Sequence, residues 1–194
     1  MIHSLCVFCG ANHGKRPAYR DAAHQLGELL AQRGITLVYG GGNVGLMGTV
    51  ADACLGAGGR VIGVIPRALA EKEIAHAGLT EMHVVGSMHE RKAMMADLAH
   101  AFIALPGGYG TWDEFCEVVT WSQLGLHQKA CAILNVGGYY DPFLAMADRA
   151  LADGFIRPAH REMVITDTDA ARLLDRLETY GVPTVEKWIR RADV

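Results

Sequence analysis

The chain has 194 residues, of which 51% are hydrophobic and 20% charged, so it can fill one hydrophobic core but is too short for two full domains. Lysine and arginine number 18 against 21 aspartate and glutamate, and the resulting net charge of −3 gives no reason to expect nucleic acid or an anionic membrane as a partner. The sequence starts without the basic and apolar regions of a signal peptide, and no apolar run reaches the ~20 residues that span a bilayer. We therefore expect one cytoplasmic domain over residues 1–194.

The cysteines are odd in number and scattered through apolar surroundings, which is typical of reduced core thiols rather than a disulfide framework. They are Cys6, Cys9, Cys54, Cys116 and Cys131. Cys6 and Cys9 form a C-x-x-C pair, but their spacing along a strand directs the two side chains to opposite faces, and no second Cys/His pair completes a zinc site. We expect no metal.

In chain order, short apolar runs alternate with longer segments of helical period, which predicts βα units that build a parallel sheet with both faces covered. The predicted strands are Leu5 to Cys9, Thr36 to Tyr39, Arg60 to Ile65, Met82 to Val85, Ala101 to Leu105, Ala130 to Asn135 and Met163 to Ile165. The predicted helices are Pro17 to Arg33, Leu46 to Ala57, Met88 to Ala99, Thr111 to Leu124, Pro142 to Asp153 and Asp169 to Tyr180. The charged segment from Arg67 to about Glu81 is expected to be a rim loop or a short helix.

Three strand ends are rich in glycine or polar residues, and each precedes a predicted helix whose free N–H groups and positive dipole end suit a phosphate. These ends are Cys9–Asn12, Gly40–Gly45 and Pro106–Thr111. Each loop alone fits a tight turn equally well, but three at one sheet edge favour a nucleotide-like ligand. Gly40–Gly45 spells G-x-G-x-x-G, yet the acid of a dinucleotide site does not follow; Arg67 is compatible with a 2′-phosphate, which leaves NADP as an alternative.

Thr111-Trp112-Asp113-Glu114 has the spacing of a capping box, in which the Thr111 hydroxyl caps a helix, Glu114 reaches back to the cap N–H and Asp113 complements the dipole. This interpretation leaves the three preceding glycines unexplained. A glycine loop followed by a carboxylate in the first helical turn also fits a substrate with an anionic end and a neighbouring centre that becomes positive. Glycosidic cleavage supplies such a centre, because its transition state is oxocarbenium-like.

The segment Met88–Met95 places two adjacent cations, Arg91 and Lys92, at the start of a helix after the fourth strand. Arginine suits a bidentate contact to phosphate or carboxylate and lysine a point charge, while a solvated charged helix face is the alternative. A zinc interpretation of His89-Glu90 fails because the fourth residue after His89 is Ala93.

The sequence resembles the Lonely Guy (LOG) family. Pro106 to Glu114 matches the family signature P-G-G-x-G-T-x-x-E, and further segments match in family order. These are Cys6 to Gly10, Leu37 to Gly42, Gly45 to Gly48, Gly63 to Pro66, Met88 to Lys92 and Trp121 to Gly125. The first loop departs from the family's serine-rich pattern, because it reads Ala11-Asn12-His13. The resemblance covers about Leu5 to Ile156.

The resemblance implies a Rossmann-like, doubly wound α/β homodimer that needs no cofactor. It implies hydrolysis of the N-glycosidic bond of cytokinin riboside 5′-monophosphates, and of AMP in many members, to free base and ribose 5-phosphate. Glu114 would be the catalytic carboxylate and Arg91 the second essential residue. The substrate-binding set carried over is Glu73, Arg91, Lys92, Gly108, Tyr109, Gly110, Thr111, Trp112, Asp113, Glu114 and Thr120.

Two alternatives remain beside the hydrolase. A non-catalytic nucleotide carrier or sensor of the same fold would use the loops but not the Glu114 chemistry. A dehydrogenase would need a nicotinamide site. An older family label, lysine decarboxylase, would require pyridoxal phosphate on a Schiff-base lysine, and the best-placed lysine, Lys92, is better explained as an anion contact.

Overall fold

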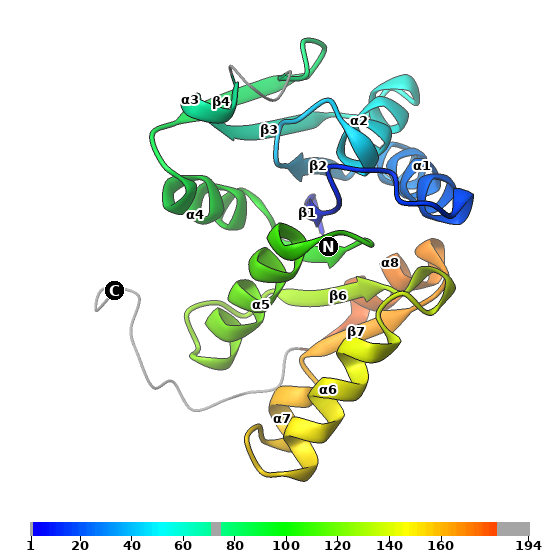
Figure 1. Ribbon diagram of the computed structural model, residues 1–194. Helices are drawn as coiled ribbons and strands as arrows, with labels where there is room; N and C mark the ends of the chain where they lie inside the picture. Colours follow the sequence, from blue (N-terminus) through cyan, green and yellow to red (C-terminus); the bar gives the residue numbers. More distant parts are fainter. Residues whose placement is uncertain (1, 71–74, 182–194) are drawn as a thin grey trace.

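The structure is a computed structural model that describes residues 2–70 and 75–181. Its strands form one parallel sheet in the order β4-β3-β2-β1-β5-β6-β7 (Figure 1). The strands are β1 (Ser4–Phe8), β2 (Thr36–Tyr39), β3 (Val61–Pro66), β4 (Glu81–Val85), β5 (Ala101–Ala104), β6 (Ala130–Leu134) and β7 (Val164–Asp167). The helices are α1 (Pro17–Gln32), α2 (Gly45–Gly56), α3 (Arg67–Ala70), α4 (Met88–Leu98), α5 (Tyr109–Gln123), η1 (Val136–Gly138), α6 (Asp141–Ala152), α7 (Pro158–Arg161) and α8 (Ala170–Thr179).

The architecture confirms the predicted α/β class, with every predicted strand and helix present and no end displaced by more than two residues. The strands are apolar almost throughout because helices cover both faces of the sheet, and β1, β3, β5 and β6 are buried along their whole length. The segment after β3 does contain a short helix, α3. The turns η1 and α7 were not predicted.

Two hydrophobic cores lie on opposite faces of the sheet. Helices α1, α2 and α8 build one core, and α4, α5 and α6 build the other, an arrangement visible in Figure 1. Cys6 belongs to the second core and Cys9 to the first, so the predicted opposite facing of the C-x-x-C pair is confirmed. One expectation for the cysteines is wrong, because Cys116 is exposed on α5 rather than buried. Within the described ranges no helix combines the length and apolarity needed to cross a membrane.

The sheet changes winding direction between β1 and β5, with β2, β3 and β4 on one side and β6 and β7 on the other. In open α/β sheets the crevice at the carboxyl ends of such a strand pair is the usual ligand site. Here the two loops at that point touch, because the backbone N–H of Gly10 donates to the carbonyl of Pro106 at 3.1 Å. The fold therefore brings the first and third glycine loops together.

Candidate active site

A cavity of about 390 Å³ opens at the carboxyl ends of β1 and β5. The β1–α1 loop (residues 9–14) and the β5–α5 loop (residues 106–108) form two of its walls, and the first turns of α5 contribute Gly110, Thr111 and Glu114. Further lining side chains come from other elements: Tyr19, Leu46, Met47, Arg91 and Tyr139. Two glycine loops and the predicted catalytic pair thus share one cavity.

Helix α5 begins earlier than predicted, and this overturns the capping-box interpretation. The helix starts at Tyr109 with Gly108 in the cap position, so Thr111 lies inside the first turn and cannot be the cap. The buried Thr111 hydroxyl instead fills the space beside Gly107, where a Cβ would overlap it. A Cβ on Gly108 or Gly110 would meet no described heavy atom within 4 Å. The helix therefore presents its first N–H groups and its positive dipole end to open space.

Arg91 is buried, so the solvated-face interpretation of this residue is wrong. Its side chain is 9% exposed, its Nε donates to the Val64 carbonyl at 3.0 Å and its Nη2 to the Gly40 carbonyl at 3.0 Å. A side chain at Gly40 would overlap the guanidinium, so the glycine is required for this placement. The two carbonyls fix the plane of the guanidinium and leave Nη1 directed to Glu114.

Glu114 faces Arg91 rather than the backbone of its own helix. Its Oε1 lies 3.6 Å from Arg91 Nη1, and its side chain is 12% exposed. Burial raises the pKa of Glu114 to about 7; Arg91 and Lys92 oppose this rise, while Asp113 and Glu117 add to it. A carboxyl group with a pKa near neutrality can hold or accept a proton at physiological pH, as an acid–base catalyst must.

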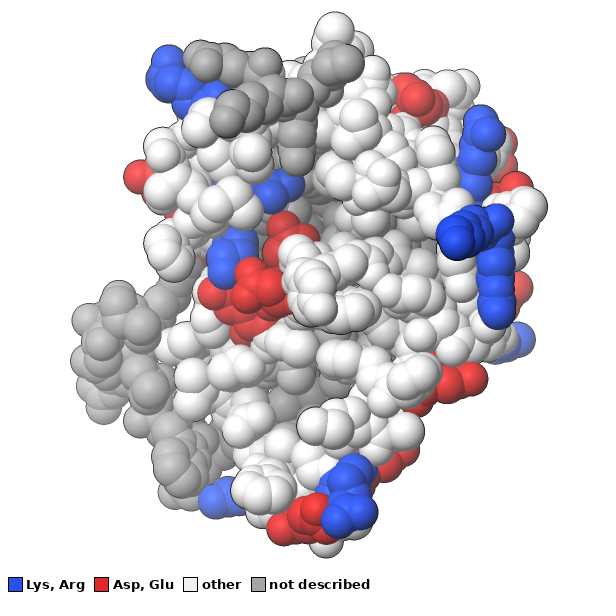
Figure 2. All heavy atoms as spheres, in the orientation of Figure 1, with Lys and Arg blue, Asp and Glu red and all other residues white. Residues whose placement is uncertain are grey.

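Lys92 is not among the described residues that line this cavity. Its Nζ donates to Asp113 at 3.2 Å and to Glu117 at 3.0 Å, and the residue lines a second cavity, of about 650 Å³, between α4 and α5. The Lys92 side chain is only 13% exposed, so it is not a solvated cation, and because α5 starts at Tyr109, Asp113 lies beyond the first turn in which it was expected to complement the dipole. Figure 2 shows acidic and basic side chains gathered in the middle of this face.

Three other predicted site residues lie at the rim or beyond it. Tyr109 and Trp112 are 86% and 37% exposed, and their rings meet edge to face at 5.2 Å. Thr120 is exposed on α5, and its hydroxyl donates to the carbonyl of Cys116 at 2.8 Å. None of the three lines the first cavity within the described part of the chain. Glu73 lies outside the described residues.

The second glycine loop, which carries the G-x-G-x-x-G spacing, is filled by the protein itself. Gly40 accommodates Arg91, and Gly41, at a φ of +77°, packs against Ile65 and Met82. Gly45, at a φ of +57°, leaves room for the backbone of the β1–α1 loop. The expectation that this loop forms a phosphate cradle is therefore wrong, and its glycines serve close packing instead.

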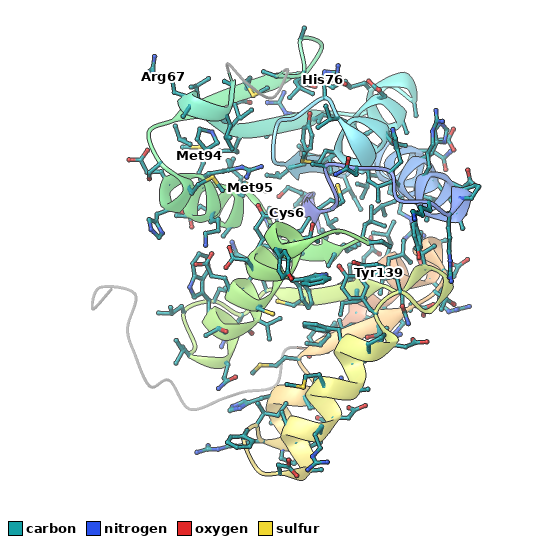
Figure 3. The ribbon with its side chains drawn as sticks, in the orientation of Figure 1. Cys6, Arg67, His76, Met94, Met95 and Tyr139 are labelled. Carbon is teal, nitrogen blue, oxygen red and sulfur yellow. The ribbon has the colours of Figure 1, made fainter. Side chains whose placement is uncertain are left out.

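Several residues that line the cavity were not predicted as site residues from the sequence. Asn12 and His13 follow β1, a strand end that had been singled out, whereas Met47, Tyr19 and Tyr139 carry no local signal of a ligand site. Of the three methionines near Arg91, Met95 is buried in the second core and Met94 packs against it (Figure 3), whereas Met88 is 42% exposed.

A family model described as "Possible lysine decarboxylase" matches residues 47–177. Among the most similar curated proteins, "Probable cytokinin riboside 5'-monophosphate phosphoribohydrolase LOGL9" of Oryza sativa subsp. japonica is 55% identical over 91% of this chain and 78% of its own length. "Cytokinin riboside 5'-monophosphate phosphoribohydrolase LOG" of the same organism is 50% identical over 94% and 75%. The protein LOG7 of Arabidopsis thaliana, with the same enzyme name, is 51% identical over 91% and 81%.

Solved structures share the fold at lower identity. The molybdenum cofactor carrier protein of Chlamydomonas reinhardtii aligns with a TM-score of 0.69 and 19% identity over 91% of this chain and 98% of its own. The DNA processing protein A of Helicobacter pylori aligns with a TM-score of 0.57 and 14% identity over 91% and 81%. At such identities these structures confirm the Rossmann-like architecture and carry no information on the ligand.

Proposed function

The chain belongs to the LOG family, and on that basis we propose that it hydrolyses the N-glycosidic bond of cytokinin riboside 5′-monophosphates to free base and ribose 5-phosphate. AMP is proposed as a further substrate. The observation that carries the proposal is the pairing of a buried carboxyl group, Glu114, with a buried arginine, Arg91, beside the free end of α5 in one cavity. This arrangement supports the proposal, because a carboxyl group with a raised pKa lies in the same cavity as a helix N-terminus.

The phosphate of the substrate binds at the start of α5 in this proposal. The N–H groups of Gly108, Tyr109, Gly110 and Thr111 have no helical partner, and the positive dipole end of the helix favours an anion. The open space at Gly108 and Gly110 supports this placement, because a side chain there would occupy the volume that a phosphate needs. The ribose then extends toward Glu114, one turn further along the same helix.

Glu114 acts at C1′ of the ribose. As the bond to the base breaks, its electron pair leaves with the base nitrogen and positive charge develops at C1′ and the ring oxygen. Ionised Glu114 stabilises that charge and accepts a proton from the attacking water, whose oxygen bonds to C1′. This proton then passes to the nitrogen of the departing base, which leaves as the neutral base, and Glu114 is ionised again. Because the pKa of Glu114 is raised to about 7, we expect kcat/KM to fall as pH drops below about 7 in a pH–rate profile.

Arg91 holds Glu114 in place and keeps part of its population ionised. The carbonyls of Val64 and Gly40 fix two of its nitrogens, and the third lies 3.6 Å from Glu114. A guanidinium held this way loses little further conformational entropy when substrate binds. Arg91 is therefore proposed as the second essential residue, which orients the carboxylate and supports departure of the base.

The remaining expectations concern the assembly and the rim of the site. We propose that the protein is a homodimer in the cytoplasm and works without a cofactor. The exposed residues Tyr109, Trp112 and Thr120 on α5 would then lie near the dimer interface or at the rim of the substrate site. Lys92 and Asp113, which contact each other, are proposed to lie at the same rim of the substrate site. Glu73 is also proposed as a substrate contact. Measurement of the molar mass in solution by light scattering tests the dimer.

The test of the function is incubation of the protein with isopentenyladenosine 5′-monophosphate and, separately, AMP, with chromatographic detection of free base and ribose 5-phosphate. Glu114→Gln should lower kcat by at least about 100-fold, as expected for loss of an acid–base group. The matched control is Glu117→Gln on the same helix, because Glu117 binds Lys92 and lines the second cavity instead. Normal turnover by folded Glu114→Gln contradicts the assignment, and saturable nucleotide binding without base release favours a carrier.

A further inference from the structure

Two consecutive tyrosines in the turn after β6 hold the backbone of the β5–α5 loop. The hydroxyl of Tyr140 donates to the carbonyl of Leu105 at 2.7 Å, and the hydroxyl of Tyr139 donates to the carbonyl of Gly107. The carbonyl between them, that of Pro106, accepts from the N–H of Gly10 at 3.1 Å. Three successive carbonyls at the entry to α5 are thus each bound by a donor from another part of the fold.

The turn that carries these tyrosines is itself braced. Asn135 donates through its Nδ2 to Asp141 at 2.7 Å and accepts from the N–H of Tyr140 at 2.8 Å. Gly137 and Gly138 adopt φ values of +58° and +74°, which lets the chain reverse within a few residues. The tyrosines therefore project from a turn whose backbone is fixed by internal hydrogen bonds.

Tyr139 faces the cavity as well as the loop. Its ring lines the cavity and meets the ring of Tyr19 edge to face at 5.7 Å, and Figure 3 labels it beside the start of α5. Tyr140, in contrast, is fully buried in the second core. Of the two hydroxyls, the one of Tyr139 thus sits at the surface that a ligand would touch.

The orientation of one peptide links Tyr139 to anion binding. The peptide between Gly107 and Gly108 is trans, and in a planar trans peptide the C=O and N–H bonds point in opposite directions. A hydroxyl that holds the Gly107 carbonyl therefore turns the Gly108 N–H away from itself. Without that hydrogen bond, a peptide flanked by two glycines has little steric resistance to rotation.

We propose that Tyr139 is a positioning residue for recognition of the substrate's 5′-phosphate, because its hydroxyl fixes the Gly107–Gly108 peptide with the N–H of Gly108 directed to the phosphate. The inference rests on the proposed function for the identity of the anion. It assigns to the β6–α6 turn a role in selecting nucleotides over nucleosides, since a nucleoside lacks the group that this N–H binds.

The experiment measures binding of ribose 5-phosphate and of isopentenyladenosine, which carries no phosphate, to the full chain and to Tyr139→Phe by calorimetry. Loss of one well-placed donor to an anion is worth about tenfold in affinity, so the dissociation constant for ribose 5-phosphate should rise about tenfold. That for isopentenyladenosine should change less than twofold. The matched control is Tyr180→Phe, which removes a hydroxyl bound to the carbonyl of Glu162; neither residue is among the described residues that line the cavity.

Unchanged affinity of folded Tyr139→Phe for ribose 5-phosphate would overturn the inference, and so would an equal loss for the nucleoside. In kinetics with a nucleotide, the variant should raise KM about tenfold with kcat within threefold, and a fall in kcat alone would also overturn it. Because the binding measurement needs no turnover, its result separates this inference from the proposed function. A protein that releases no base, yet binds ribose 5-phosphate in a Tyr139-dependent way, would refute the function and retain the positioning role.

Discussion

The β2–α2 loop and the β5–α5 loop are both rich in glycine and lie at the same edge of the sheet, but they use glycine in opposite ways. In the β2–α2 loop the missing side chains are replaced by protein, with the Arg91 guanidinium at Gly40 and the β1–α1 backbone at Gly45. In the β5–α5 loop the space at Gly108 and Gly110 stays open toward the cavity. A glycine run thus indicates close approach, and the packing around it decides whether the approaching group is protein or ligand.

The largest effect is expected at Gly45, where alanine would combine a left-handed φ of +57° with overlap of the β1–α1 backbone. Strain of about 1–2 kcal/mol and overpacking of about 1–3 kcal/mol should together lower the free energy of unfolding by about 2–5 kcal/mol. Urea denaturation measures the change. The control is Gly34→Ala, which has a similar φ of +66° but open space around it and should show the strain alone. Equal losses at both positions would show that the β2–α2 loop is not closely packed.

The second prediction concerns Glu114, which joins the two loops through Arg91. The unfolded chain loses the Glu114 proton near pH 4.5, whereas the folded chain keeps it up to about pH 7, so ionisation destabilises the fold as pH rises through this window. Removing that cost, Glu114→Gln should gain stability relative to the parent by up to about 3 kcal/mol between pH 4 and pH 8. Chemical denaturation at a series of pH values measures it. Parallel stability curves for parent and variant would mean that Glu114 is not buried as described.

Third, Gly40→Ala should displace the Arg91 guanidinium from the two carbonyls that hold it. The buried hydrogen bonds lost should cost about 2 kcal/mol of stability, and misplacement of Arg91 should lower kcat/KM about 100-fold. Both are measured on the purified variant. Gly56→Ala on α2, where a Cβ has open space, should leave turnover unchanged and should not lower stability. Full activity of Gly40→Ala would show that the position of Arg91 does not matter for the reaction.

The smallest effect on stability is expected at Gly110, where alanine meets no described atom. Stability should stay within about 0.5 kcal/mol of the parent. The added methyl group would intrude on the proposed phosphate position, so KM for a nucleotide should rise about tenfold while the melting temperature is unchanged. A strong loss of stability with unchanged KM would mean that the β5–α5 loop, like the β2–α2 loop, is packed against protein rather than open to a ligand.

The spacing of hydrophobic residues was enough to predict the strands and the principal helices. A strand covered on both faces is a continuous apolar run, and an amphipathic helix repeats its apolar residues every three to four positions, so both can be recognised in the local sequence. The proximity of Glu114 and Arg91 in one cavity also agrees with the sequence, since both residues stand in segments that resemble the LOG family. What Arg91 contacts was not, because Gly40 and Val64 lie far from it in sequence and meet it only through the β2 and β3 strand ends.

The capping box shows why local patterns fail at such a site. Thr111 and Glu114 have the right spacing, but the helix starts two residues earlier, at Tyr109, and tertiary contacts claim both side chains. Tyr139 illustrates a second limit. Its role depends on a hydrogen bond to Gly107 across the sheet edge, and no periodicity or short motif records such a pairing.

The central position of β1 has a consequence for how the protein is made. Its neighbours are β2, which follows soon in the chain, and β5, which follows only after two more strands and their helices. Pairing with β5 closes a long loop and pays the entropy of that closure, so it belongs among the slow, high-contact-order events of folding. On the ribosome, the first half of the chain can form strands β1 to β4 before the β5–α5 loop, which lines one side of the cavity, has been made. The chain can therefore bind a nucleotide only after β1 has paired with β5. A ligand that contacts both the β1–α1 and the β5–α5 loops binds the folded state alone and so stabilises it against unfolding.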